Sequence, residues 1–158
     1  IKERAEPCQL TLQYLFFGTK QLISCRALGC KLSSRSFSCP RSAARRRLIC
    51  IAETVAKAIP HASISTVNLA EVVGKLADSG MPEEAVQGAL AGLGIKVIPF
   101  DEDLAYRSGL LRPLTSAYGL SLGDRACLAL GQRLSQPVLT ADRGWASLKI
   151  GVNVRVIR

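Results

Sequence analysis

The second two thirds of the chain alternate between short runs typical of strands and longer runs with helical spacing. The strand-like runs are residues 62–65, 95–100, 137–141 and 152–157, and the helix-like runs are residues 49–59, 67–78, 83–93, 101–112 and 122–134. Strands separated by helices pair in parallel, and the helices cover the faces of the sheet. The sequence therefore predicts an α/β fold with a mostly parallel central sheet flanked by helices.

Several residues mark the expected ends of these helices. Pro82 followed by Glu83 and Glu84 is typical of a first helical turn, because proline needs no amide hydrogen there and acids favour the positive end of a helix. Asp101 is a suitable N-cap for the helix that follows it. We expect Pro113 to break or bend that helix at its far end.

The first fifty residues have a different composition. They contain ten Lys or Arg against two acids, a charge of +8, and five of the six cysteines, whereas residues 51–158 carry eleven basic and ten acidic residues. Gln9–Phe17 fits a strand, but residues 18–47 have no period and we predict no structure for them. We divide the chain into an atypical, disordered or misread segment, residues 1–50, and a folded domain, residues 51–158. The basic segment either binds RNA phosphates non-specifically or stays solvated.

The sequence contains no run of eighteen apolar residues, so we expect no membrane-spanning segment. Leu10–Phe17 resembles part of a signal peptide but is short and interrupted by Gln13. No cysteine pair has C-x-x-C spacing, which argues against a zinc site, and Cys127 lies among apolar residues and is expected to be buried. We expect a cytoplasmic protein.

Three acids fall where a parallel sheet places its ligands, beyond the carboxyl ends of the strands. Asp142 directly follows residues 137–141, Glu71 lies in the helix after residues 62–65, and Asp124 lies in the first turn of helix 122–134. Acids this close to apolar residues are rare unless they are paired or bind a cation, and three at one edge repel one another unless a cation joins them. This coincidence favours a metal site.

Each acid also has a simpler interpretation. Asp124 is typical of a first helical turn, and Asp142 is typical of an N-cap before a short helix. Glu71 is placed to pair with Lys75 one turn later. Taken singly, these local interpretations are favoured, and only the combination of the three acids points to metal binding.

The segments around these acids resemble the PIN-domain ribonucleases, specifically the VapC toxins of bacterial toxin–antitoxin pairs. The similar segments are Ile64–Val73, Leu120–Leu130 and Val138–Trp145, in an order and spacing that agree from about Thr54 to Arg158. The resemblance implies a PIN-like three-layer fold, Mg²⁺ or Mn²⁺ held by clustered carboxylates, and cleavage of RNA. It also implies a cognate VapB-like antitoxin and a homodimer.

By this resemblance, Glu71, Asp124 and Asp142 are the catalytic and metal-binding residues, and Thr140 is a polar neighbour at the end of a strand. Arg125 and Arg143 are adjacent in sequence to two of these acids and are candidates for contacts with phosphates. Mg²⁺ prefers oxygen ligands and keeps several waters, and a bound cation can activate a water molecule for attack on a phosphate. The single histidine, His61, is not needed for this chemistry.

One acid of the family pattern is missing. Family members normally begin with a hydrophobic strand that ends in an aspartate, but here the corresponding position falls near residues 32–38, and no acid occurs between Glu6 and Glu53. Glu53 is too close in sequence to Glu71 to replace it. The first segment is divergent and supplies no acid, Glu6 folds back into the site, or the first fifty residues come from a wrong reading frame or start.

Two functions of different classes therefore stay open. The chain is either an endoribonuclease toxin, impaired by the missing aspartate, or a non-catalytic remnant that binds an antitoxin or dimerises. A nucleotide-binding protein would rest on Gly92 and Gly94 alone, without a complete phosphate-binding motif, and is a weak third candidate.

Overall fold

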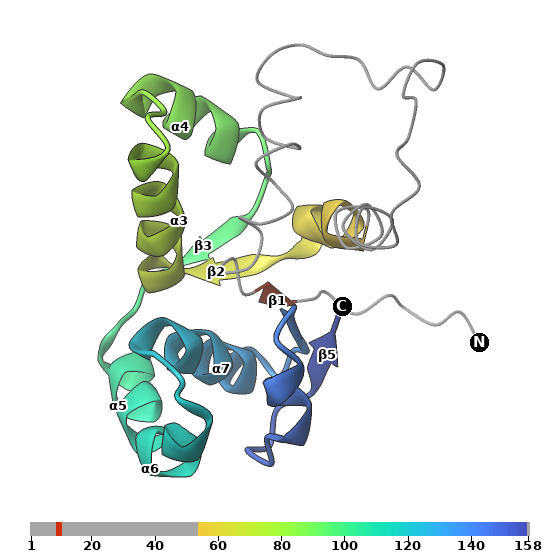
Figure 1. The fold of residues 1–158 in the computed structure, drawn as a ribbon. Helices are drawn as coiled ribbons and strands as arrows, with labels where there is room; N and C mark the ends of the chain where they lie inside the picture. The colour runs from red at the N-terminus through yellow and green to blue at the C-terminus, as the bar shows by residue number, and fades with distance from the viewer. Residues whose placement is uncertain (1–8, 11–53, 158) are drawn as a thin grey trace, which may run out of the picture.

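A computed structural model describes residues 9–10 and 54–157 of the 158-residue chain (Figure 1). Residues 54–58 are helical, and the elements that surround and follow them are β1 (Gln9–Leu10), η2 (Ile59–His61), β2 (Ser63–Ser65), α3 (Thr66–Asp78), α4 (Glu83–Ala91), β3 (Lys96–Ile98), α5 (Glu102–Leu110), α6 (Arg112–Thr115), η3 (Ser116–Tyr118), α7 (Leu122–Leu134), β4 (Val138–Thr140), η4 (Arg143–Ser147) and β5 (Val154–Val156). The predicted alternation of strands and helices is confirmed.

All of the described strand pairs are parallel, as the sequence predicts. β4 pairs with β1 on one side and with β5 on the other, and β2 pairs with β3. β1 also contacts β2, so it lies between the two groups of strands (Figure 1). The strand predicted within Gln9–Phe17 is therefore present at Gln9–Leu10, and it occupies a central place between the strands of the domain.

The predicted helices differ from the observed ones mainly at their ends. α7 has the predicted bounds, whereas α4 ends two residues earlier than expected, at Ala91. The helix expected after Asp101 is divided at Leu111 into α5 and α6. Pro113 lies in the first turn of α6, where its missing amide hydrogen leaves no helical bond unmade, so the bend precedes the proline.

Helix α7 forms the centre of the larger hydrophobic core. Its buried residues pack against α5, β4 and η4, and Leu128 and Leu130 are fully buried together with Leu104 of α5 and Trp145 of η4. Cys127 is buried there too, as predicted. A second cluster joins β2, α3 and α4 through Ile64, Val72, Leu76 and Val86. α3 contacts α7 directly, so the two cores are held against each other.

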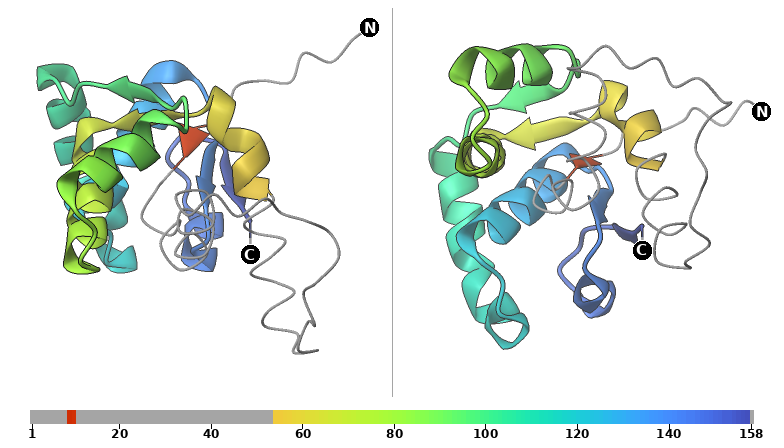
Figure 2. Two further views of the ribbon diagram at one scale, coloured as in Figure 1. Left: turned by 90° about the horizontal axis from the view of Figure 1, so that it is seen from above. Right: turned by 45° about the horizontal axis from the view of Figure 1, so that its top comes forward.

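Helices lie on different sides of the strands, which gives the predicted layered α/β arrangement. Figure 2 shows the helical residues 54–58, in yellow, and α5, in teal, separated by the strands. None of the helices in the described part of the chain has the length and apolar character needed to cross a bilayer. The predicted domain boundary near residue 50 lies outside the described residues.

Candidate functional site

The side chain of Glu71 points from α3 to the first turn of α7. A Cβ atom at Gly123 of α7 would lie only 2.6 Å from Cδ and from Oε2 of Glu71, so the carboxylate occupies the space that a side chain there would need. Asn68, one turn before Glu71, donates its amide hydrogens to Oε2 of Glu71 at 3.3 Å and to the carbonyl oxygen of Gly123 at 2.9 Å. The Glu71 carboxylate therefore lies beside the residue that precedes Asp124.

Asp124 is held by its own helix terminus. Ser121 is the N-cap of α7, and its hydroxyl accepts a hydrogen bond from the backbone amide of Asp124 at 3.2 Å. In return, Oδ2 of Asp124 accepts from the backbone amide and the hydroxyl of Ser121, both at 2.8 Å. This reciprocal capping uses one carboxylate oxygen and leaves Oδ1 without a hydrogen bond among the described residues.

Asp142 is also held locally, at the end of β4. Its Oδ1 accepts from the backbone amide of Gly144 at 2.8 Å, so Asp142 is the N-cap of η4, as one of the two sequence interpretations expects. The buried hydroxyl of Thr140 accepts from the backbone amide of Asp142 at 3.1 Å and fixes the turn. The predicted place of Thr140 beside Asp142 is thus observed.

The structure brings Glu71 to the first turn of α7 but does not gather the three acids into a ready-made ligand group. Within residues 9–10 and 54–157, no three Asp, Glu, His or Cys side chains lie together as metal ligands would. The chemistry of the donors nevertheless fits Mg²⁺ or Mn²⁺, because the side chains are carboxylates and Mg²⁺ is usually held by one or two of them together with water and phosphate. The three-residue ligand set stays a prediction.

The two arginines near these acids have different surroundings. Arg125 is only 9% exposed, and it donates from Nε to the carbonyl of Ser108 at 3.2 Å and from Nη1 to that of Leu120 at 2.8 Å. It ties α7 to α5 and to the loop before α7, which is a structural role rather than a contact with phosphate. Arg143 is exposed at the start of η4 and stays available for an anion.

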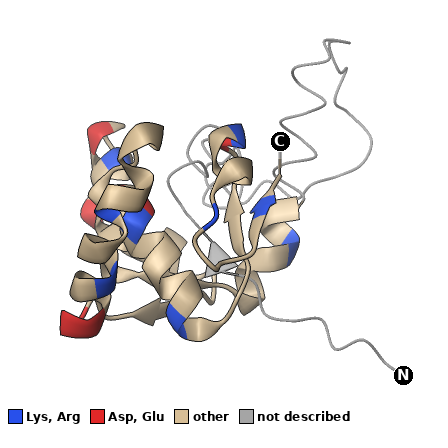
Figure 3. Ribbon diagram, turned by 90° about the horizontal axis from the view of Figure 1, so that it is seen from below, with Lys and Arg blue, Asp and Glu red and all other residues tan. Residues whose placement is uncertain are grey.

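Basic residues are spread over the described fold. Figure 3 shows Lys and Arg on several helices and strands of the described fold. The nearly balanced charge of residues 51–158 agrees with this distribution.

Comparison with known protein families identifies the domain. Residues 44–150, more than half of the chain, match the PIN domain. The chain belongs to the PIN domain family. Comparison of this PIN domain with curated proteins gave no match.

Solved structures agree on the fold of this PIN domain. A DNA-bound VapBC from Salmonella typhimurium has a TM-score of 0.64 at 15% identity, covering 97% of this chain and 99% of the other. A toxin–antitoxin complex from Klebsiella pneumoniae has a TM-score of 0.53 at 23% identity, covering 72% and 86%. VapBC2 from Rickettsia felis, bound to a DNA fragment from its promoter, has a TM-score of 0.51 at 18% identity, covering 70% and 85%. At these identities the likeness establishes the PIN-like fold.

Sequence reasoning missed two residues of the site in this PIN domain, Asn68 and Gly123. Asn68 lies three positions before Glu71, on the same side of a helix, and that spacing is a signal that was available. Nothing local distinguishes Gly123, because its lack of a side chain matters only once α3 packs against α7.

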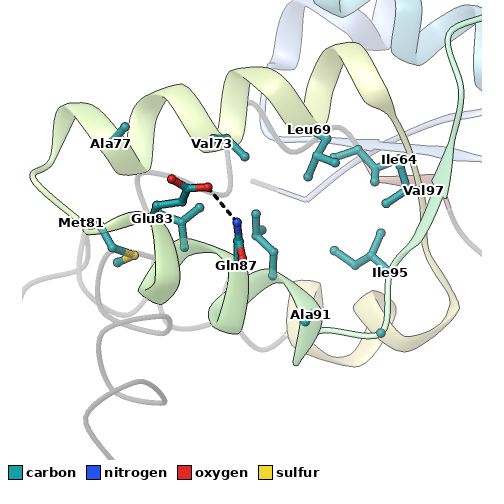
Figure 4. Close-up of a pocket in the computed structure, with 13 residues that line it drawn as sticks. Ile64, Leu69, Val73, Ala77, Met81, Glu83, Gln87, Ala91, Ile95 and Val97 are labelled. Carbon is teal, nitrogen blue, oxygen red and sulfur yellow. Dashed lines mark hydrogen bonds between the residues drawn. The ribbon is translucent and has the colours of Figure 1, made fainter.

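The opposite side of α3 forms an apolar groove with α4 and β3. Leu69, Val73 and Ala77 of α3 face Gln87 and Ala91 of α4 across it (Figure 4). Its polar side chains include Glu83 and Gln87, which are hydrogen-bonded to each other at 2.9 Å. The groove is therefore suited to binding an apolar surface, and the carboxylate side of α3 remains the candidate for chemistry in this PIN domain.

Proposed function

We propose that this PIN domain is a Mg²⁺- or Mn²⁺-dependent endoribonuclease of the VapC toxin type. The observation that carries the proposal is the position of the Glu71 carboxylate, which lies against the first turn of α7, one residue from Asp124. The order of the elements supports it too, because Glu71 lies in the helix that follows β2 and Asp142 lies two residues after the end of β4. The overall PIN fold supports the assignment.

We assign Glu71, Asp124 and Asp142 as the residues that would hold the ion. Their local hydrogen bonds do not prevent this, because Asp124 uses Oδ2 and Asp142 uses Oδ1, which leaves one oxygen of each without a hydrogen bond among the described residues. When bound, the cation would activate a water molecule and neutralise charge on the phosphate that is attacked. The protein's part is to fix the carboxylates at the ends of its strands and helices before RNA arrives.

Substitution of Asp124 tests the proposal most directly. Asp124→Asn keeps the size of the side chain and an oxygen that can accept from Ser121, but removes the charge that a cation needs. We expect Mg²⁺-dependent cleavage of a structured RNA to fall by at least about 10–100-fold. Mutation of a residue that only hydrogen-bonds a metal ligand already costs about that much, and Asp124 is proposed as a ligand itself. Cleavage would be followed on gels, with EDTA added to a parallel sample to remove the metal.

Asp78→Asn is the matched control. Asp78 is exposed and is the last residue of α3, and loss of a negative charge at the C-terminus of a helix does not destabilise the helix. We expect its cleavage rate to equal that of the unaltered chain. Cleavage that persists in Asp124→Asn, or that continues in EDTA, would refute the metal assignment.

The missing aspartate bears on how active the chain is. β1 ends at Leu10, and the next acid in the sequence is Glu53, so no carboxylate follows this strand directly. A lost ligand costs at least about 10–100-fold in affinity or activity, so we propose an impaired nuclease. The alternative is a catalytically inactive remnant that binds an antitoxin or dimerises, and absence of any metal-dependent cleavage at high protein concentration would favour it.

We further propose two protein partners in the cytoplasm, a VapB-like antitoxin and a second copy of this chain. The similar solved structures, which are toxin–antitoxin complexes, support the first. The groove between α3 and α4 suits an apolar helix face of an antitoxin, because Val73 and Val97 are 38% and 46% exposed there. For self-association, a row of exposed apolar residues crosses α5, α6 and η3 at intervals of four: Tyr106, Leu110, Leu114 and Tyr118.

A further inference from the structure

With the Glu71 carboxylate in its observed position, the contact between Glu71 and Gly123 leaves no room for a side chain at position 123. A Cβ atom there would lie 2.6 Å from Cδ and Oε2 of Glu71, and real Cβ atoms essentially never come within 3.0 Å of another heavy atom outside their own chain neighbours. Gly123 does not have a positive φ, so its backbone conformation does not require glycine. The space for the carboxylate is what the absence of a side chain provides.

Asn68 of α3 holds the Glu71 carboxylate in this space by hydrogen bonds. It is 1% exposed, and its amide group donates both to Oε2 of Glu71 and to the carbonyl of Gly123. One amide group therefore links the carboxylate of α3 to the backbone of α7. Its own side-chain oxygen, Oδ1, is buried and has no hydrogen-bond partner among the described residues.

Neither residue is the best choice for folding alone. Glycine inside a helix is less favourable than alanine, because it loses more conformational freedom on folding. A buried amide oxygen without a partner, such as Oδ1 of Asn68, is also unfavourable. Both features are explained if they serve the position of the carboxylate rather than the stability of the core.

We propose that Asn68 and Gly123 are positioning residues, which together hold the carboxylate of Glu71 beside Asp124 and so set the place of one metal ligand. This inference rests on the proposed metal-dependent function and adds residues that are not themselves ligands. Gly123 supplies the space and Asn68 supplies the hydrogen bond that keeps the carboxylate in it.

The test is a calorimetric titration of the full chain with Mn²⁺ alone, in the unaltered protein and in Gly123→Ala. A methyl group at position 123 displaces the carboxylate, and we expect Mn²⁺ affinity to fall by about 10–100-fold, the usual effect of losing support for a ligand. Gly109→Ala is the matched control, because a Cβ at Gly109 of α5 meets no atom within 4 Å. We expect it to bind Mn²⁺ as the unaltered chain does.

Asn68→Leu keeps the size of the side chain and removes the donor, so it tests the same idea without crowding. We expect a similar loss of Mn²⁺ affinity, together with a modest fall in the unfolding temperature, because the buried hydrogen bond to the carbonyl of Gly123 is lost as well. The side-chain amide signals of Asn68 in NMR should also shift in Glu71→Gln, with or without metal. A merely structural Asn68 would lower the unfolding temperature when replaced and leave Mn²⁺ affinity unchanged.

The outcomes separate this inference from the proposed function. If the unaltered chain binds Mn²⁺ and both Gly123→Ala and Asn68→Leu bind it equally well, the positioning role is wrong and the ribonuclease proposal stands. If the unaltered chain binds Mn²⁺, the two variants lose affinity and no RNA is cleaved, the positioning role stands and the ribonuclease proposal fails. An unaltered chain that binds no Mn²⁺ overturns both.

Discussion

Helix α7 contains two buried glycines, Gly123 and Gly131, at which a side chain would collide with a neighbour, but the neighbours differ. At Gly123 the space is filled by the end of the Glu71 side chain. At Gly131 it is filled by a methyl group of Val138 in β4, and a methyl group of Val152 lies 3.0 Å from where a Cβ would be. The same residue type thus serves the site at one end of the helix and the core at the other.

The difference lies in how freely each neighbour can move. A glutamate side chain has several rotatable bonds, so the Glu71 carboxylate can swing away from an added methyl group at small cost to the fold. Val138 is fully buried within a strand paired on both sides, and a β-branched side chain is stiff. Crowding at Gly123 should therefore change function more than stability, and crowding at Gly131 should do the reverse.

The largest expected effect on stability follows from Gly131→Ala. The added methyl group overpacks the junction between α7 and β4, and overpacking typically costs about 1–3 kcal/mol. For a domain of this size, that lowers the unfolding temperature by roughly 4–8 °C per kcal/mol. Urea and thermal unfolding would measure it, with Gly123→Ala as the comparison. If Gly123→Ala proves the more destabilising of the two, the contrast between the two ends of α7 is wrong.

How much of this site the sequence could predict depends on how far apart in the sequence the contacting residues lie. The bounds of α7, the place of Asp124 in its first turn and the N-cap role of Asp142 were predictable, because helix periodicity and helix termini are local patterns. The position of Glu71 was not, since it depends on the packing of α3 against α7, across more than fifty residues of sequence. The roles of Gly123 and Asn68 were missed for the same reason.

The fold shows the same division. The order of strands and helices followed from alternation along the chain, but the break at Leu111 did not, because a proline in the first turn of the next helix looks the same in sequence as a proline that ends one. The buried role of Arg125 was also unexpected, as its acceptors are the carbonyls of Ser108 in α5 and of Leu120 in the loop before α7.

Ser121→Ala is expected to have a smaller effect than Gly131→Ala and tests the local support at the site end of α7. Losing the N-cap hydroxyl costs about 1 kcal/mol in typical helices, and it also removes one of the two donors to Oδ2 of Asp124. Urea unfolding would measure the loss. Ser116→Ala removes an exposed hydroxyl from η3 and serves as the control, with an expected change within about 0.5 kcal/mol. Equal stability of the two variants would argue that the cap contributes nothing.

The smallest expected effect concerns Asp101, an exposed residue that pairs with Arg133 in the last turn of α7. Nη1 of Arg133 donates to both of its carboxylate oxygens, at 2.6 and 2.8 Å, and the backbone amide of Leu104 donates at 3.0 Å. The hydrogen bond from Arg133, followed by that from Leu104, lowers the pKa of Asp101 below its usual 3.8. Because the folded state favours the ionised form, this stabilisation is present above the unfolded pKa and is lost as the pH falls through the lower folded pKa.

Asp101→Asn should therefore unfold at a slightly lower temperature than the unaltered chain at pH 7, with the gap closing once the pH is taken below about 4, where the unfolded carboxyl group is protonated. The effect is small because the carboxylate is exposed and screened by solvent. Thermal unfolding at a series of pH values measures it, with Asp78→Asn as the control. A gap that stays constant across this pH range would show that the Arg133 contact does not contribute through charge.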